Sequence, residues 1–239
     1  MQKSPSLQTL PHLTKTEIIN TKTNFIQSKL TIKPQIRIIM KLAIASNNAH
    51  KLDEIKSILG GCFDELLSIK DLGIDIDIEE TGTTLIENAL IKARTIRDLT
   101  GMVTLADDTG LMVDALNGEP GVYSARYAGE EHNYPKNNEK LLRNLAGVPD
   151  EKRTARFKTV IAVCFPDGTE LTCEGCVEGK IATELRGERG FGYDPLFYSF
   201  ELGKVFAEGT LEEKNSVGHR GRALRKMLEI LKENQHLLK

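Results

Sequence analysis

Apolar and polar residues along this chain follow two periodicities, one typical of buried strands and one typical of amphipathic helices. Continuous apolar runs at 38–45 and 103–106 predict buried strands, since a strand covered on both faces carries apolar side chains throughout. Helical spacing of apolar residues at 52–59 and from about 84 to 99 predicts helices with one buried face. Strands that alternate with helices in this way favour an α/β fold.

The second half of the chain adds a hairpin and further helices. Alternating β-prone residues at 155–165 and 170–176 flank a Pro-Asp-Gly turn and predict a hairpin, which we assign to the smaller of two lobes. A helix is expected at 135–145, and a last helix near His219 with a packing stripe at 223–231. We therefore expect an elongated, mixed central sheet with helices on both sides and a cleft between two lobes.

The stretch Val103–Gly110 carries two adjacent acids. Its apolar start runs into Asp107 and Asp108, and the Thr-Gly dipeptide that follows predicts a turn, so the acids are expected at a strand end. Neighbouring side chains on an extended backbone point to opposite faces, so one acid is expected to act and the other to brace it. Two anions this close repel, which a cation would relieve. The alternative is that both acids cap a turn.

The composition limits the kind of protein this is. Its 239 residues, 40% of them hydrophobic, suffice for one large domain or two packed lobes, and no apolar run approaches the ~20 residues that span a bilayer. We therefore expect a soluble protein without a membrane partner. The net charge of -2 argues against a nucleic-acid partner, so an anionic substrate would need a local positive cluster.

The cysteines, at positions 62, 164, 173 and 176, do not form the framework of a secreted protein. Cys173 and Cys176 make a CxxC motif, but no second pair completes a zinc site, and alternation within a strand explains the spacing. Reduced thiols in strands indicate a cytoplasmic location.

Residues 1–39 differ from the rest of the chain. They hold six basic residues against the single acid Glu17, a net charge of +5 that leaves -7 for the remainder. They are rich in polar residues and lack a sustained period, which predicts disorder. A transit peptide would favour Arg over Lys. We expect that Met40 is the natural start and that one two-lobed domain covers 40–239.

Other stretches offer chemistry as well. Ser46–Lys51 lies between a strand and a helix N-terminus, where free N–H groups and a lysine favour an anion, although a plain helix cap would look the same. Glu79 precedes another helix N-terminus, where it favours the dipole or supplies a metal-binding oxygen. Phe191 between glycines offers a stacking face or marks a structural loop. His219 and Arg220 would usually be a solvated pair.

Several blocks of sequence keep a fixed order from Met40 to near the C-terminus. They are Ser46–Lys51, Glu79–Gly82, Ala106–Gly110, Pro120–Arg126, Phe191–Pro195, and Lys214 with His219 and Arg220. Together these blocks resemble the inosine triphosphate pyrophosphatase family, also described as the non-canonical purine NTP pyrophosphatases. Any one block alone would mean little, whereas the ordered set argues strongly against a chance match.

The resemblance implies hydrolysis of the bond between the α and β phosphates of ITP, dITP or XTP. The products would be the nucleoside monophosphate and pyrophosphate. The cofactor would be Mg²⁺, and the protein would be a homodimer. Asp108 would be the proton acceptor and would hold the metal together with Glu79. Thr109 would touch the substrate, and Lys92 would lie near the phosphates.

The resemblance also assigns residues to substrate binding. The triphosphate would be bound by Ser46, Asn47, Asn48, Ala49, His50 and Lys51. The base would be framed by Phe191, Gly192, Tyr193 and Asp194, with Lys214, His219 and Arg220 completing base and phosphate recognition. One departure is Gly218, where the family usually has serine. Glycine is a fair N-cap, so the departure bears on base selectivity rather than on the fold.

Elementary chemistry agrees with these assignments. A triphosphate carries about four negative charges, so a magnesium ion on carboxylates, helped by lysines, is what an acidic protein needs. The carbonyl at C6 of hypoxanthine or xanthine suits a donor such as Arg220, and an adenine amino group does not.

Two other functions remain open at this point. One is a pyrophosphatase for modified pyrimidine triphosphates, as in the Maf-like proteins, and the other is a nucleotide-binding module without turnover. A pure binder gains nothing from Glu79 and Asp108 facing magnesium beside a labile phosphate, so the acids favour an enzyme.

Overall fold

The computed structural model describes residues 38–238 of the chain. The segment 1–39, expected to be disordered or wrongly included, thus lies outside the described residues except for Ile38 and Ile39. These two residues already belong to the first strand, β1 (Ile38–Ile44), so the described chain begins slightly before Met40. The expectation for the rest of the segment stays a prediction.

The centre of the fold is a mixed sheet, 8-stranded within the described residues, in the order β2-β1-β3-β5-β6-β7-β8. Its further strands are β2 (Phe63–Ser68), β3 (Thr104–Val113), β4 (Pro120–Gly121), β5 (Thr154–Cys164), β6 (Glu170–Ile181), β7 (Phe197–Ser199) and β8 (Lys204–Val205). β1 runs parallel to β2 and β3, whereas the other pairs are antiparallel, including β4 on β3. The expected mixed sheet is confirmed.

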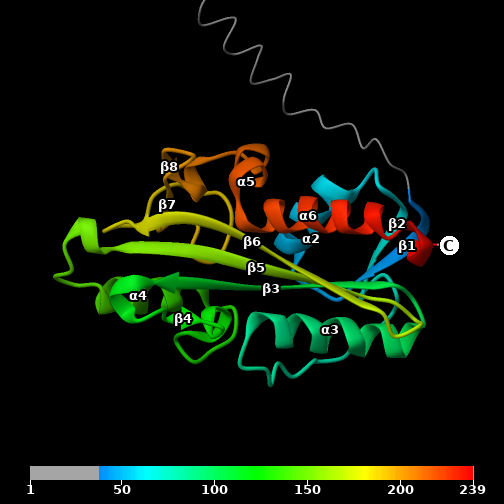
Figure 1. The fold of residues 1–239 in the computed structure, drawn as a ribbon. Coiled ribbons are helices and arrows are strands. Elements are labelled where there is room, and N and C mark those ends of the chain that lie inside the picture. Colours follow the sequence, from blue (N-terminus) through cyan, green and yellow to red (C-terminus); the bar gives the residue numbers. More distant parts are fainter. Residues whose placement is uncertain (1–37, 239) are drawn as a thin grey trace, which may run out of the picture. The chain divides into compact units, whose positions relative to one another are not determined.

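Helices cover both sides of this sheet. They are α2 (Ala49–Leu59), α3 (Leu85–Thr100), α4 (Tyr134–Asn144), α5 (Leu211–Val217) and α6 (His219–Glu233). In Figure 1, α3 and α4 lie below the strands, and α5 and α6 lie above them. Short 3₁₀ turns connect these elements at Asp114–Leu116, Ser124–Arg126, Asp150–Lys152, Phe206–Glu208 and Gln235–Leu238.

Local sequence signals place the ends of the two helices nearest the site. Asn48 caps α2, because its side-chain oxygen accepts the N–H of Lys51. Thr84 and Glu87, three residues apart in the sequence, form a capping box at the start of α3, where the Thr84 hydroxyl accepts the Glu87 N–H. The structure therefore confirms the expected starts of both helices.

The two faces of the sheet are packed differently. Between α3 and the sheet, small side chains such as Ala93 of the helix and Ala43 and Ala106 of the strands allow the helix to lie close. On the other face, larger residues such as Ile44 and Met227 fill the space beneath α2 and α6. A further cluster of buried aromatic residues surrounds Phe157, Phe197 and Phe206. These cores hold the centre of β3 rigidly between helices.

Two expectations about the strands were wrong. No turn interrupts β3 at Thr109 and Gly110, because every residue from Thr104 to Val113 stays in register with β5. A side chain at Gly110 would lie 2.7 Å from the carbonyl oxygen of Gly121, so this glycine serves the close approach of β4. The hairpin of β5 and β6 is also not a smaller lobe, since β5 pairs with β3 in the middle of the sheet.

Candidate active site

The candidate site lies at a gap in the sheet beside β3. β1 pairs with β3 only at Thr104 and Leu105, and β4 pairs with it only at Leu111 and Met112. Among the described strands, none covers that side of β3 between these two pairings. Asp107 and Asp108 therefore reach the same gap from opposite faces of the strand. The acids lie beside the end of the neighbouring strand and not, as expected, at the end of their own.

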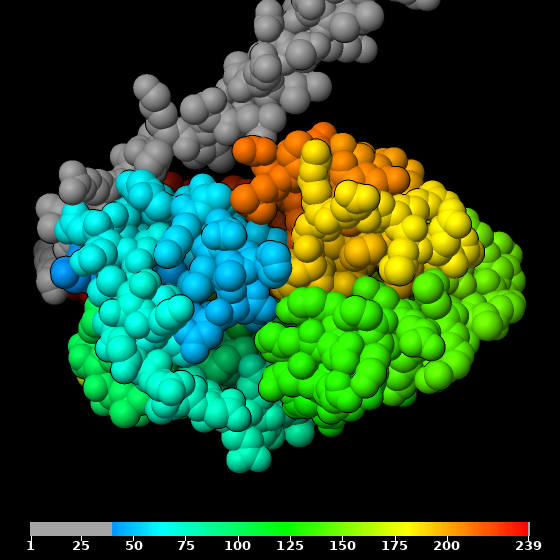
Figure 2. All heavy atoms as spheres, turned by 180° about the vertical axis from the view of Figure 1, so that it is seen from behind, coloured from blue at the N-terminus to red at the C-terminus, as the bar shows by residue number. Residues whose placement is uncertain are grey.

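A pocket open to solvent lies at this gap, and its empty space is about 760 Å³ when the solvent at its mouth is included. Figure 2 shows a hollow between the blue segment, which includes α2, and the green segment before α4. The pocket is lined by Asn48, Lys51, Glu80, Asp108, Thr109, Val122, Ser124, Ala125, Glu131, His132, Tyr134, Phe157, Phe191, Gly192, Tyr193, Asp194, Lys214, His219 and Arg220.

Asp108 faces α3 and is only half satisfied. Lys92 donates to its Oδ1 at 2.9 Å and to Oε1 of Glu80 at 2.6 Å, so one ammonium joins two carboxylates. Oδ2 of Asp108 is buried and finds no hydrogen-bond partner among the described residues. Burial raises the pKa of Asp108 and outweighs the nearby Lys92 charge. The group is thus an acid with a free oxygen and an increased affinity for a proton.

Asp107 faces α2 and α6 and is surrounded by positive charge. Its Oδ2 accepts two bonds from Arg220, at 2.9 and 3.1 Å, and lies 3.3 Å from Nζ of Lys51. Burial opposes its ionisation, but Lys51 and Arg220 outweigh burial and hold its pKa below the usual range. Arg220 also donates to the Thr109 hydroxyl at 3.1 Å. Asp107 is therefore a permanent anion that fixes these side chains.

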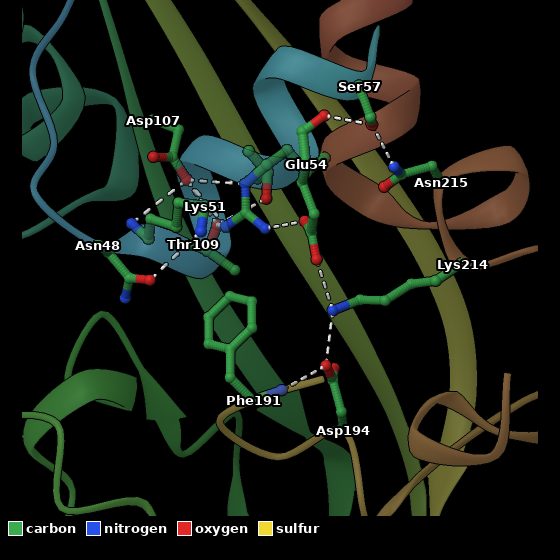
Figure 3. A network of polar contacts seen from close by, with 12 residues as sticks. Asn48, Lys51, Glu54, Ser57, Asp107, Thr109, Phe191, Asp194, Lys214 and Asn215 are labelled. Atoms are coloured by element: carbon green, nitrogen blue, oxygen red, sulfur yellow. Dashed lines mark hydrogen bonds and ion pairs between the residues drawn. The ribbon is translucent and has the colours of Figure 1, made fainter. Parts of the chain in front are cut away.

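Glu54 extends this network toward the other rim of the pocket, as Figure 3 shows. It lies between Arg220, with which it makes a short ion pair, and Lys214, whose Nζ is 2.7 Å from Oε1 of Glu54. Lys214 also donates to Asp194 at 2.6 Å. Burial opposes ionisation of Glu54, but its two cations outweigh burial and lower its pKa to about 2. Positive and negative groups thus alternate from Lys51 to Asp194.

The network ends at an aromatic wall. Oδ2 of Asp194 accepts the N–H of Phe191 at 2.9 Å, and a side chain at Gly190 would lie 2.1 Å from the same oxygen. The Phe191 ring stacks on His50 at 5.1 Å with an interplanar angle of 7°. Nζ of Lys214 lies 4.8 Å from the centre of the Phe191 ring. The Phe191 ring is therefore an aromatic surface with cations beside it.

His219 and Arg220 are buried and do not form the solvated pair that such residues usually make. The His219 ring stacks on Phe157 at 4.6 Å, and its Nδ1 has no hydrogen-bond partner among the described residues. Burial, helped by the charges of Arg220 and Lys214, holds the pKa of His219 well below its ordinary value. The imidazole is thus neutral and offers one unsatisfied nitrogen in the wall of the pocket.

Most residues expected at the site meet in this pocket. Those that line it are Asn48, Lys51, Asp108, Thr109, Phe191, Gly192, Tyr193, Asp194, Lys214, His219 and Arg220. Ser46 stabilises the loop before α2, since its hydroxyl accepts the N–H of Asn48 at 3.2 Å. Those outside the lining are Ser46, Asn47, Ala49, His50 and Glu79. Glu79 is exposed, whereas the neighbouring Glu80 lines the pocket, so the expected metal role of Glu79 stays a prediction.

Sequence reasoning missed other residues of the site. Glu54 is a charged residue of a predicted amphipathic helix, where exposure is the ordinary expectation, yet it is 3% exposed, because Arg220 and Lys214 pair with it. Its spacing of one helical turn from Lys51 was a usable signal, since the two share a face. Glu80 and Tyr134 were not assigned to the pocket at all. The irregular segment that holds Glu80 has no periodicity from which its direction could be derived.

Comparison with known proteins gives consistent matches over most of the chain. A family model described as the Ham1 family matches residues 42–230. A dITP/XTP pyrophosphatase of Thermoanaerobacter sp. (strain X514) is 55% identical over 188 residues, which are 79% of this chain and 94% of that protein. A dITP/XTP pyrophosphatase of Clostridium perfringens is 50% identical and covers 80% of this chain and 97% of its own length.

Solved structures agree with the sequence comparison. The Ham1 protein of Staphylococcus aureus superimposes with a TM-score of 0.72 at 41% identity, covering 81% of this chain and 99% of that one. A nucleoside-triphosphatase, or dITP/XTP pyrophosphatase, of Mycobacterium abscessus gives 0.65 at 44% identity, with 79% and 99% covered. Separately, no helix among the described residues is long and apolar enough to cross a membrane.

Proposed function

This chain belongs to the Ham1 family, and we propose that it hydrolyses dITP, XTP and ITP to the monophosphate and pyrophosphate. The names of its relatives, dITP/XTP pyrophosphatases at about half identity, support this activity. One observation carries the chemistry. It is the free, buried Oδ2 of Asp108 in a pocket that also holds cations and an aromatic wall. The cations and the aromatic wall suit a nucleotide, and the oxygen of Asp108 suits a water molecule beside it.

Asp108 is the proposed proton acceptor. A water held by its free oxygen attacks the α phosphorus, and the bond between this phosphorus and the bridging oxygen breaks. Pyrophosphate leaves with that oxygen, and the proton of the water passes to the carboxylate. The raised pKa of Asp108 favours this step, because a base gains driving force as its affinity for protons rises.

The charges of the pocket suit the rest of the substrate. Lys51 and the N–H groups at the start of α2 offer positive potential to the triphosphate, together with the other loop residues Ser46, Asn47, Asn48, Ala49 and His50. The base stacks on Phe191 beside Gly192, Tyr193 and Asp194. Lys214, His219 and Arg220 supply polar groups to its edge, and Thr109 touches the substrate.

Magnesium is the proposed cofactor, and the residues present fit it. Lys92 already brings Glu80 and Asp108 to one cation, so these two carboxylates would supply the hard oxygen ligands of the ion. No group of three acidic, histidine or cysteine side chains suited to a metal occurs among the described residues, so phosphate oxygens and waters would complete the shell. When bound, Mg²⁺ neutralises phosphate charge and polarises the phosphoryl oxygens.

The proposal includes a homodimer, as the family resemblance implies, and a cytoplasmic location, as the reduced thiols indicate. Among the described residues, large apolar side chains such as Leu99, Tyr123 and Phe200 are more than half exposed and are available for an interface. Sedimentation of the purified chain tests the dimer.

Product analysis tests the activity. With dITP or XTP and Mg²⁺, the chain is expected to release pyrophosphate and the monophosphate, to be silenced by EDTA, and to act far more slowly on GTP. Release of single phosphate, or equal rates with GTP, contradicts the proposal. Glu79→Gln and Glu80→Gln, compared side by side for the Mg²⁺ concentration that gives half activity, identify which acid joins Asp108 at the metal.

A further inference from the structure

Tyr134 connects two parts of the site that come from distant segments. It is the first residue of α4, and its hydroxyl accepts a hydrogen bond of 3.2 Å from the side-chain amide of Asn48. Its ring lies 6.0 Å from the ring of Phe191, tilted by 54°, and stacks on His132 at 5.9 Å. Tyr134 thus contacts both the loop before α2 and the aromatic wall.

The side chain of Asn48 makes two hydrogen bonds, which fix its orientation. Its Oδ1 accepts the N–H of Lys51 at 3.2 Å and so caps α2, while its Nδ2 donates to Tyr134. An asparagine that lost the second bond could rotate away and leave the first N–H groups of α2 without a fixed cap. The Tyr134 hydroxyl therefore holds in place the end of α2 that carries Lys51.

The same face of α4 also contacts the loop of the aromatic wall. Asn138, one helical turn after Tyr134, is buried and donates to the carbonyl oxygen of Gly192 at 3.0 Å. Gly192 follows Phe191 directly, so this bond anchors the loop of the aromatic wall. The helix thus contacts both Asn48 and Gly192, and both residues line the pocket.

We infer that Tyr134 is a positioning residue, whose hydroxyl orients Asn48 and so sets the phosphate-binding loop at a fixed span from the base-stacking wall. This inference rests on the proposed function, because it takes Asn48 and Phe191 as the two ends of a nucleotide site. A rigid span lowers the ordering cost when a nucleotide binds both ends at once. The loss of the hydroxyl therefore weakens binding more than it slows the chemical step at Asp108.

Tyr134→Phe removes the hydroxyl and keeps the ring. It is expected to raise KM for dITP about 3- to 10-fold, the range of one hydrogen bond, with kcat within about twofold of the parent. The dissociation constant of pyrophosphate, measured by titration calorimetry, is expected to rise by a similar factor. Tyr198→Phe, which alters a tyrosine of β7 outside the pocket, is the matched control and should change neither value.

A double-mutant cycle separates positioning from direct substrate contact. Asn48→Ser keeps a helix-capping oxygen and removes the amide donor. In that background, Tyr134→Phe is expected to raise KM for dITP by less than about 1.5-fold. An equal effect of Tyr134→Phe in both backgrounds would mean that the hydroxyl touches substrate directly, and would overturn the inference. An unchanged KM for Tyr134→Phe in the parent protein would overturn the inference as well.

The calorimetric arm separates this inference from the proposed function. If the parent protein binds dITP and pyrophosphate without releasing products, the proposed hydrolysis fails, while the cycle of dissociation constants still tests Tyr134. If the parent binds neither ligand, both proposals fall together.

Discussion

The two faces of β3 carry adjacent aspartates in opposite electrostatic surroundings. Toward α6, Asp107 is held by Arg220 and Lys51, and the chain of alternating charges continues through Glu54 to Lys214. Toward α3, Asp108 shares Lys92 with a second carboxylate. Each aspartate keeps one buried oxygen without a partner among the described residues, but of the two only Asp108 lines the pocket. The pKa of Asp107 is lowered and that of Asp108 is raised, so one residue type serves two purposes.

The difference shows how a buried cluster leaves one of two adjacent carboxylates with a raised pKa. Arg220 is bound by Asp107 and Glu54, and Lys92 is shared between Asp108 and Glu80, so burial outweighs the cations at Asp108. Asp107 thus braces its neighbours as expected, whereas the expectation that Asp108 acts stays a prediction. Substitutions at each aspartate should therefore differ in what they damage.

The largest expected effect is on catalysis at Asp108. Asp108→Asn should lower kcat for dITP by about 10²- to 10⁴-fold, the usual contribution of a general base. The melting temperature should stay equal or rise, because a raised pKa means that the ionised carboxylate costs the fold stability at neutral pH. Pyrophosphate release and thermal unfolding measure the two effects. Asp53→Asn, at an exposed acid on α2, is the control, and a variant at Asp108 that keeps a tenth of the activity would refute the assignment.

The opposite profile is expected at Asp107. Asp107→Asn removes the carboxylate that pairs with Lys51 and leaves Arg220 with Glu54 alone, in a buried position, which should lower the free energy of unfolding by about 3 kcal/mol. Denaturant unfolding provides the measurement. A change as small as that at the exposed Asp53 would show that the network on this face does not stabilise the fold.

A smaller effect is expected from acid on the same network. The pKa of Glu54 is lowered from 4.5 to about 2, so its stabilisation is fully present above pH 4.5 and is lost as the pH falls toward 2. As the pH falls from 4.5 to about 2, the free energy of unfolding of the parent protein should decrease by about 2 kcal/mol more than that of the Glu54→Gln variant, which has no carboxylate to protonate at this position. Parallel slopes of stability against pH for the two proteins would contradict this account.

Local chemistry made part of this site predictable from sequence. The capping box at Thr84 and Glu87 and the cap at Asn48 depend on residues within one helical turn, so their pattern suffices. The opposite directions of Asp107 and Asp108 follow from the pleat of any strand. The identity of the pocket residues at 191–194 and 214–220 came from the ordered blocks, not from spacing.

Long-range contacts were beyond such reasoning. Arg220 pairs with Glu54 across 166 residues of sequence and with Asp107 across 113, and no local period encodes either distance. The expected turn at Gly110 failed for a related reason. A glycine that favours a turn in isolation is used here to admit Gly121 of a neighbouring strand.

The unbroken pairing of β3 with β5 has a consequence for how this chain can change over time. Asp107 lies opposite Ile161 and Asp108 opposite Val160, in a register fixed along the whole strand. Adding or removing one residue ahead of the aspartates would exchange their faces, and would send the reactive acid into the ion network and the bracing acid toward Lys92. Evolution can therefore vary the side chains of this strand far more readily than its length.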